Sequence, residues 1–308
     1  MDPVTNTETA LGVKTDIRIE RILCPVDFSE ASLKAYHHAQ SIASHYGATL
    51  YAQYAVELWQ YPSCDFAISV NAYEEFRQAL ISKGEDALHQ FVRTCGGLQP
   101  ECIVQESPAA DAILSFAKAR AISLIVLGTH GRRGFDRLML GSVTERVLRH
   151  ASCPVLAVRQ KAPDSGPRGA TDAPVQIRRI LCGVDFSANS QRALEYALSA
   201  AKAYDAEVSI LHVLDNIPDS ADPAKETDAA VEKLEELLPP GVPCSAKTHL
   251  EVRLGKASQE ILKFASEEKS DLIVTGVRGR NSLDLAVFGS TTYRVMQLGP
   301  VPVLTVPI

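Results

Sequence analysis

The sequence predicts two α/β domains in tandem, each a doubly wound sheet of five parallel strands with helices on both faces. Two observations lead to this prediction. Within the 308 residues, the stretch Arg21-Ile-Leu-Cys-Pro-Val-Asp-Phe-Ser29 returns as Arg179-Ile-Leu-Cys-Gly-Val-Asp-Phe-Ser187 with a single difference. Short continuous runs of Ile, Leu and Val also alternate with longer amphipathic stretches, a pattern typical of parallel strands that are covered by helices.

Two further motifs repeat later in the chain. Leu124-Ile-Val-Leu-Gly128 returns as Leu272-Ile-Val-Thr-Gly276, and Cys153-Pro-Val-Leu-Ala-Val158 returns as Val301-Pro-Val-Leu-Thr-Val306. Such a long period indicates a duplicated domain and not a solenoid.

The stretch between the two copies has the composition of a linker. Residues 160–176 contain three prolines, two glycines and no apolar periodicity, which is typical of a tether. We therefore expect an N-terminal tail over residues 1–17, a first domain over 18–159, a linker over 160–176 and a second domain over 177–308.

Each element follows from its own pattern of apolar residues. In the first domain, apolar runs predict strands at Ile22–Val26, Ala48–Val56, Cys102–Gln105, Ile122–Leu127 and Pro154–Val158. Apolar residues at helical spacing predict helices at Glu30–Tyr46, Tyr73–Thr94, Ala109–Arg120 and Ser142–His150. The second domain repeats this order, with helices at Ala188–Tyr204, Ala224–Leu238, Ser258–Lys269 and Ser290–Gln297. Aromatic residues inserted after the second strand form a lid or partner patch, or else pack over the sheet edge: Trp59, Tyr61, Phe66 and Tyr73.

Composition and charge narrow the classes of function. Hydrophobic residues make up 46% and charged residues 22%, the balance of a folded globular protein. A net charge of −6 argues against a broad basic surface for nucleic acid. No apolar run approaches the roughly 18 residues of a membrane span, and residues 1–20 lack the basic and apolar regions of a secretory signal. We expect a cytoplasmic protein without nucleic-acid or membrane partners.

The seven cysteines form no CxxC motif. Because a chain of this length folds without disulfide staples, we expect free or buried thiols in a reducing cytosol. A redox switch is the alternative.

A loop punctuated by glycines follows the fourth strand of each domain. Both copies read Gly, two residues, Gly, nine residues, Gly-Ser, and their members are Gly128, Gly131, Gly141 and Ser142, then Gly276, Gly279, Gly289 and Ser290. The first two glycines allow a sharp turn and a close approach of a ligand to backbone N–H groups. We expect Ser142 and Ser290 to cap the following helix, with Ser142 and Glu145 forming a capping box. The N–H groups at that helix start favour an anion such as phosphate.

Acidic residues stand at the ends of the first strands. Ligands of open parallel sheets bind beyond the carboxyl ends of the strands, where the strand order reverses. Asp27 and Asp185 follow the first strand of each domain, so we expect them near the glycine loops. The competing interpretation is structural, because such a loop is often only a turn and a duplication preserves structure as well as binding.

Motifs of common enzymes are missing from the sequence. We find no GxxxxGKS/T, GxGxxG, HExxH or GxSxG. No general base or nucleophile stands beside the glycine loops, so we assign no catalytic residue. One carboxylate per site is too few for a dedicated metal centre, so we assign no metal ligand.

These residues together resemble the universal stress protein family in its tandem two-domain form. The family motif Gly-x2-Gly-x9-Gly-Ser/Thr fits both loops, and the strand ending in Val-Asp-Phe-Ser and the terminal Pro-Val-Leu-x-Val strand also match. The resemblance implies the strand order 3-2-1-4-5 and ATP or another adenine nucleotide, with or without Mg²⁺, between the first and fourth strands.

The resemblance also implies roles for individual residues. Asp27 and Asp185 would contact adenosine, the backbone of Ala55 and Val213 would meet adenine, and Leu127 and Thr275 would line the pocket. Ribose and phosphates would be held by Gly128, Gly131, Gly141, Ser142, Val143 and Thr144, and by Gly276, Gly279, Gly289, Ser290, Thr291 and Thr292. The last strands, Val155–Val158 and Val303–Val306, would pair within one chain or across a homodimer, which covers exposed sheet edges.

Two departures from the family pattern fall in the first domain. Ser107-Pro108-Ala stands where the second domain has Gly255-Lys-Ala, and Tyr54-Ala55 stands where the second domain has His212-Val213. The function that we predict is a nucleotide-dependent regulatory protein. The alternatives are a slow ATPase or autophosphorylating enzyme, with the Ser and Thr of the loop ends as acceptors, and a protein-interaction scaffold that needs no ATP.

Overall fold

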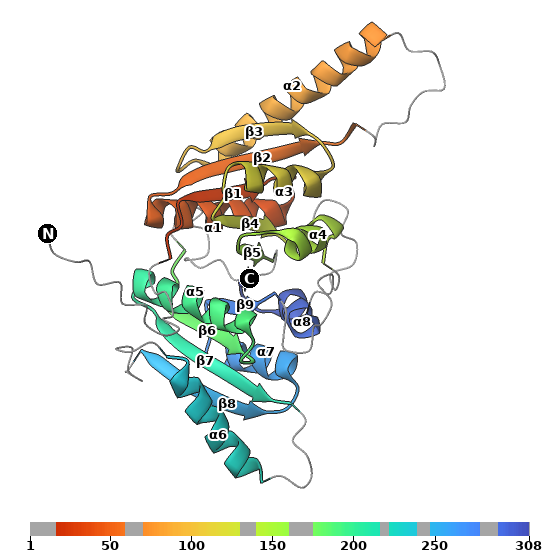
Figure 1. The fold of residues 1–308 in the computed structure, drawn as a ribbon. Helices are drawn as coiled ribbons and strands as arrows, with labels where there is room; N and C mark the ends of the chain where they lie inside the picture. The colour runs from red at the N-terminus through yellow and green to blue at the C-terminus, as the bar shows by residue number, and fades with distance from the viewer. Residues whose placement is uncertain are drawn as a thin grey trace, which may run out of the picture.

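A ten-stranded sheet runs through both halves of the chain (Figure 1). The computed structural model describes residues 17–58, 70–129, 140–159, 175–215, 222–238, 247–277 and 289–307. The strand order is β3-β2-β1-β4-β5-β10-β9-β6-β7-β8. Every pairing within a half is parallel. Each half therefore has the order 3-2-1-4-5, which confirms the predicted doubly wound α/β fold.

The first half contains five strands and four helices among its described residues. They are β1 (Arg21–Pro25), α1 (Glu30–Tyr46), β2 (Thr49–Val56), α2 (Val70–Cys95), β3 (Glu101–Glu106), α3 (Ala109–Ala119), β4 (Leu124–Gly128), α4 (Ser142–His150) and β5 (Val155–Val158). Helix α1 begins after Ser29, whose side chain accepts from the Ser32 N–H, and ends at Gly47 in the left-handed conformation. These local signals explain why its predicted bounds agree with the structure.

The second half repeats this series. Its elements are β6 (Arg179–Val184), α5 (Ala188–Tyr204), β7 (Glu207–Leu214), α6 (Pro223–Glu236), β8 (Thr248–Leu254), α7 (Ala257–Glu267), β9 (Leu272–Gly276), α8 (Ser290–Leu298) and β10 (Val303–Val306). Ser187 caps α5 as Ser29 caps α1. The two halves thus use the same local rules at equivalent positions.

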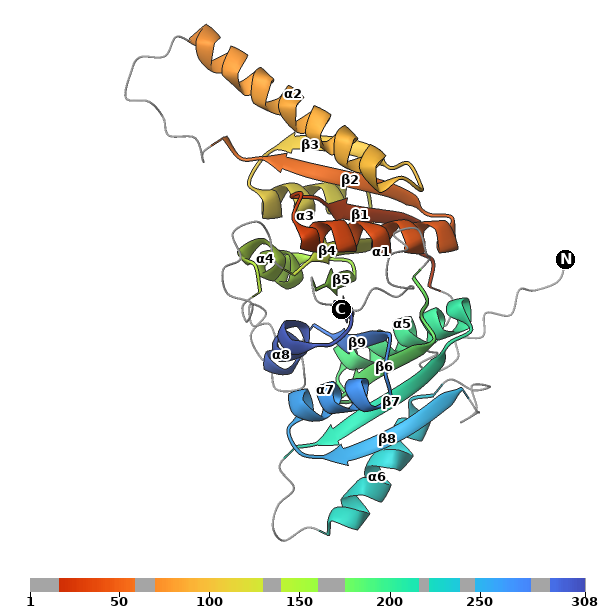
Figure 2. The same cartoon turned by 180° about the vertical axis from the view of Figure 1, so that it is seen from behind.

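Helices cover both faces of the sheet (Figures 1 and 2). Alternate side chains of a strand point to opposite faces, so Ile22 and Cys24 pack with α1 and α2, whereas Leu23 packs with α3 and α4. Both layers are buried, which accounts for the continuous apolar runs in the strand sequences.

The two halves meet at their last strands. Strands β5 and β10 pair antiparallel, with Ala157 opposite Val303 and Leu156 opposite Leu304. On the α1/α5 face, the His45 ring stacks on Tyr204 with 4.0 Å between ring centroids. Neither last strand is left as an open edge.

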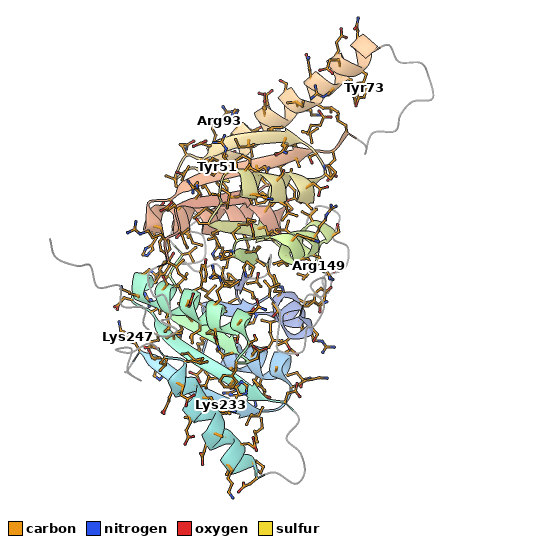
Figure 3. The ribbon with its side chains drawn as sticks, in the orientation of Figure 1. Tyr51, Tyr73, Arg93, Arg149, Lys233 and Lys247 are labelled. Carbon is orange, nitrogen blue, oxygen red and sulfur yellow. The ribbon has the colours of Figure 1, made fainter. Side chains whose placement is uncertain are left out.

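Helix α2 extends past the sheet that it covers (Figure 3). It has 26 residues, whereas its counterpart α6 has 14. Tyr73 lies near the outer end of α2 and is 50% exposed, so it does not pack over the sheet edge. The other inserted aromatic residues, Trp59, Tyr61 and Phe66, lie outside the described residues.

The described part of the chain contains neither a membrane-spanning helix nor a disulfide bond. None of its helices combines the length and the apolar character needed to cross a membrane. The thiols of Cys24, Cys95, Cys102, Cys153 and Cys182 in these described ranges are free.

Candidate functional site

The carboxyl ends of β1 and β4 lie side by side at the point where the strand order reverses. Strand β1 pairs with β2 on one side and with β4 on the other. This register places Asp27, which follows β1, at the same sheet edge as Gly128, the last residue of β4. The second half places Asp185 and Gly276 in the same way. The fold therefore brings Asp27 and Gly128 to one sheet edge, and Asp185 and Gly276 to the equivalent edge of the second half.

Each aspartate holds the turn between its strand and the next helix. The Ser29 N–H and hydroxyl donate to Asp27 Oδ1 at 3.0 and 2.6 Å. The Ser187 N–H and hydroxyl donate to Asp185 Oδ1 at 3.1 and 2.5 Å. Both carboxylates thus have a structural role at the edge, one that the sequence interpretation did not include.

A phenylalanine beside each aspartate has a left-handed backbone. Phe28 has φ of 64° and Phe186 has φ of 63°, a conformation that costs about 1–3 kcal/mol for a residue with a large side chain. Ring contacts hold the two residues there, Phe28 with Tyr54 at 4.8 Å and Phe186 with His212 at 4.4 Å between centroids. Neither phenylalanine was predicted to belong to the site, although its repetition in both copies is a signal that could have pointed to it.

The predicted adenine-facing residues lie at the ends of the second strand of each half. Ala55 stands opposite Gln105, and Val213 stands opposite Arg253, in the parallel pairings of these strands. Both residues are half-buried. The Val26 N–H donates to Gln53 O at 2.8 Å, which ties this strand end to the end of β1.

The first glycine of each loop is required by packing. A Cβ on Gly128 would lie 2.8 Å from the backbone carbon of Ala31, and a Cβ on Gly276 would lie 2.8 Å from the Asn189 Cβ. Such contacts are too close for any side chain. These glycines let the fourth strand approach the helix that follows the first strand, which differs from the reason predicted for them.

Helices α4 and α8 begin at Ser142 and Ser290 as predicted, but the cap of each lies one residue earlier than predicted. Gly141 and Gly289 occupy the cap positions, and neither helix has a side-chain cap bond. The predictions that Ser142 and Ser290 are caps and that Ser142 forms a capping box with Glu145 were wrong. Both serines are the first helical residues, and Glu145 pairs with Arg149 at 2.6 Å instead.

This corrected register leaves the helix start suited to an anion. In α4, the Glu145 N–H donates the first helical backbone hydrogen bond to the carbonyl oxygen of the cap residue Gly141, at 2.9 Å. The N–H groups of Ser142, Val143 and Thr144 precede that bond, so the helix supplies no acceptor for them. The equivalent groups in the second half are those of Ser290, Thr291 and Thr292.

The third helical residue ties each helix to its strand. The Thr144 hydroxyl donates to Gly128 O at 2.9 Å, and the Thr292 hydroxyl donates to Gly276 O at 2.9 Å. Both threonines are buried. Their hydroxyls therefore fix the helix start over the strand end.

The predicted lining residues are buried beneath this edge. Leu127 and Thr275 are both 4% exposed. Leu127 packs in the core with α3 and α4, whereas the Thr275 hydroxyl has no hydrogen-bond partner in the part of the chain that the structure describes.

The middle glycines of the two motifs, Gly131 and Gly279, lie outside the described residues. Within the described ranges, no group of three or more His, Cys, Asp or Glu side chains is arranged to hold a metal ion.

Two open α/β sheets with the same glycine-containing edge define a tandem α/β protein with duplicated candidate sites. Comparison with known families gives a match to the universal stress protein family over residues 18–159 and 176–307. The chain belongs to this family.

Individual relatives agree with that assignment. A universal stress protein of Methanocaldococcus jannaschii is 34% identical over 143 residues, which are 46% of this chain and 82% of that protein. One of Mycolicibacterium smegmatis is 25% identical over 299 residues, which are 92% of this chain and 96% of that protein. The crystal structure of a universal stress protein from Archaeoglobus fulgidus has a TM-score of 0.65 at 22% identity, covering 94% of this chain and 99% of that chain. This last likeness concerns the fold alone.

Proposed function

We propose that the protein binds ATP or another adenine nucleotide at the carboxyl edge of each half and acts as a nucleotide-dependent regulatory protein of the stress response. The observation that carries the proposal is the repeated edge itself. In both halves an aspartate turn, a glycine strand end and a helix start whose first N–H groups receive no acceptor from the helix lie together. Membership of the universal stress protein family supports the same reading.

Each group at the edge has a role in this proposal. The N–H groups at the starts of α4 and α8 hold the phosphates, because unused helix N–H groups and the helix dipole both favour an anion. Asp27 and Asp185 accept hydrogen bonds from the ribose, and the backbone at Ala55 and Val213 meets adenine. Mg²⁺ accompanies the phosphates as a counterion.

The proposal includes a regulatory consequence. Nucleotide binding at this edge changes how the halves, a second copy or a protein partner pair with it. The pairing of β5 with β10 within one chain and a cytoplasmic location belong to the same proposal. No step of chemistry on the nucleotide is required for it.

The first experiment identifies what the purified protein carries. The protein is denatured, and the released small molecules are identified by mass and counted per chain. Calorimetric titrations with ATP, ADP, AMP and cAMP, with and without Mg²⁺, follow. We expect one or two adenine nucleotides per chain.

A pair of variants tests the position of the sites. Gly131→Glu combined with Gly279→Glu puts a carboxylate into both loops and should abolish binding while the fold survives. Ser44→Glu is the matched control, since it adds the same charge to an exposed position of α1 and should leave binding unchanged. If the double variant still binds ATP, the site assignment is wrong. If the unaltered protein binds none of the four nucleotides, the scaffold function takes its place.

A further inference from the structure

One arginine side chain forms a hydrogen bond between the two halves. Arg159 follows the last residue of β5, and its Nη1 donates to the carbonyl oxygen of Gly299 at 2.8 Å. Gly299 is the C-cap of α8 in the other half. The guanidinium is partly buried, and the loss of solvent lowers its pKa from the ordinary arginine value. Removing a guanidinium from water costs free energy unless hydrogen bonds within the protein compensate for it, as the bond to Gly299 does in part.

On the first-half side, Arg159 is one residue away from the backbone that carries the α4 helix start. Gly128 stands opposite Val158 in the β4–β5 pairing. The Thr129 N–H donates to Val158 O at 3.0 Å, and the Gly141 N–H donates to Thr129 O at 2.9 Å. Gly141 is the α4 cap, so a continuous hydrogen-bonded path joins the first site to Arg159.

On the second-half side, Arg159 holds the end of the helix whose start forms the second site. Helix α8 has nine residues, and its first turn is Ser290–Thr292. A cation at the C-terminus of a helix and an anion at its N-terminus both interact favourably with the helix dipole. Position 299 has no room for a side chain, because a Cβ on Gly299 would lie 2.5 Å from the Val295 carbonyl oxygen.

The second half has no equivalent of Arg159. The second half repeats the path with bonds from the Gly289 N–H to Val277 O at 3.2 Å and from the Val277 N–H to Val306 O at 3.1 Å. The residue after Val306 is Pro307, which stands where the first half has Arg159. Because proline has no side-chain donor, Pro307 cannot form the equivalent hydrogen bond to the end of α4.

We infer that Arg159 is a positioning residue that couples the two nucleotide sites, so that nucleotide in the first half raises the affinity of the second. This inference rests on the proposed function. Nucleotide at the start of α4 stabilises the hydrogen-bonded Gly141–Thr129–Val158 path and, through it, the position of Arg159. The guanidinium then holds the last turn of α8, and the N–H groups at the other end of α8 are preorganised for phosphate.

The test measures ATP binding by calorimetry at each site with the other site open or blocked. Gly131→Glu blocks the first site and Gly279→Glu blocks the second. The coupling factor is the affinity of the second site when the first is open, divided by its affinity when the first is blocked. In otherwise unaltered protein we expect a factor of roughly 5 or more, the lower range of measured couplings.

Substitution of Arg159 then separates coupling from folding. Arg159→Met keeps the length of the side chain and should bring the factor to about 1, while the affinity of the first site, measured with the second site blocked, is unchanged. Arg159→Lys keeps a charged donor and should restore part of the coupling. Arg93→Met removes an exposed arginine from α2 and should preserve the full factor. Urea unfolding of each variant checks that the fold is intact.

Three results would overturn the inference. They are two independent sites in the unaltered protein, coupling that persists in Arg159→Met, and a loss of affinity in Arg159→Met that is also seen at each site when the other site is blocked. If no adenine nucleotide binds at all, the proposed function fails and the coupling with it. If nucleotide binds and the coupling factor of Arg159→Met equals that of the unaltered protein, only the role of Arg159 is rejected and the proposed function stands.

Discussion

At the scale of single residues, glycines of the chain serve distinct physical purposes. Gly128 has no side chain because α1 lies against it, with the Ala31 backbone 2.8 Å from the position of a Cβ. Gly47 ends α1 with φ of 64° and has open space around it. No side chain fits at Gly128, whereas Gly47 only requires a residue that tolerates the left-handed conformation.

Gly128→Ala should therefore lower the free energy of unfolding by about 1–3 kcal/mol, the usual cost of overpacking. Gly47→Asn is the control and should cost less than about 1 kcal/mol, because asparagine tolerates a left-handed backbone. Urea unfolding measures both. Unchanged stability of Gly128→Ala together with weaker nucleotide binding would mean that this glycine serves the ligand and not the packing.

The thiols give a second test at the residue scale. Burial raises the pKa of Cys95 to about 11 and those of Cys153 and Cys182 to about 12, and it raises that of Cys24 further. Since the thiolate is the reactive form, these four thiols should resist alkylation in the folded protein at pH 8. Brief iodoacetamide treatment followed by peptide mass spectrometry reads each site, with urea-unfolded protein as the control. Rapid labelling of Cys95 in the native state would favour the redox switch.

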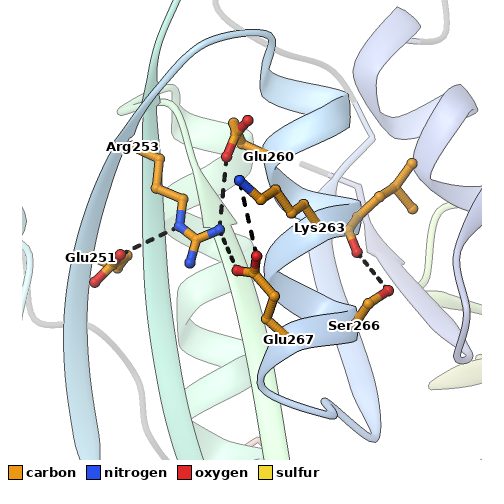
Figure 4. A network of polar contacts seen from close by, with 7 residues as sticks. Glu251, Arg253, Glu260, Lys263, Ser266 and Glu267 are labelled. Carbon is orange, nitrogen blue, oxygen red and sulfur yellow. Dashed lines mark hydrogen bonds and ion pairs between the residues drawn. The ribbon is translucent and has the colours of Figure 1, made fainter.

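At the scale of elements, an ionic network joins β8 to α7 (Figure 4). Arg253 lies 2.8 Å from Glu267, 3.3 Å from Glu251 and 3.7 Å from Glu260, and its guanidinium stands 4.7 Å from the centre of the Phe264 ring. The first half has Gln105 at the equivalent strand position. One cation thus holds three carboxylates at the edge strand of the second half.

Arg253→Met should lower the free energy of unfolding by about 1–2 kcal/mol, because charge-assisted hydrogen bonds are lost and three carboxylates are left together. Lys263→Met is the control. Lys263 is 62% exposed and lies 3.9 Å from Glu267, so its loss should cost less than about 0.5 kcal/mol. Denaturant unfolding at low and high salt checks the prediction. Equal costs for the two variants would contradict it.

At the scale of the whole molecule, the β5–β10 pairing joins two sheets into one. Leu156 and Leu304 stand opposite each other there and are 4% and 9% exposed. Both belong to the apolar layer under α1 and α5. The relative position of the two proposed sites therefore depends on this pair of short strands.

Leu156→Lys combined with Leu304→Lys should open this junction, because two like charges would be buried face to face. We expect a larger radius of gyration in small-angle X-ray scattering and a loss of about 3–5 kcal/mol in stability, the range for an uncompensated buried charge. Leu156→Lys with Leu304→Glu restores charge balance and should recover about half of that loss. An unchanged radius in the first variant would show that other contacts hold the halves together.

Local signals explain how far the elements could be predicted. The bounds of α1 and α5 were predicted to the residue because serine caps and left-handed ends mark them in the sequence. The caps of α4 and α8 were misplaced by one residue, since a glycine followed by a serine offers two adjacent candidates. The structure chose glycine because the next threonines must reach back to the strand ends at Gly128 and Gly276.

The strand order was predicted through the family resemblance. The sequence by itself determined the duplication, the α/β class, and the shared carboxyl edge of Asp27 with Gly128 and of Asp185 with Gly276. These follow from repeats, apolar periodicity and short-range motifs. Only the tertiary structure decided why Gly128 is glycine, how Phe28 is held in a left-handed backbone, and that Arg159 reaches Gly299 across 140 residues of chain. Such contacts depend on how strands and helices pack together, and the order of residues along the chain does not show which distant residues will meet in space.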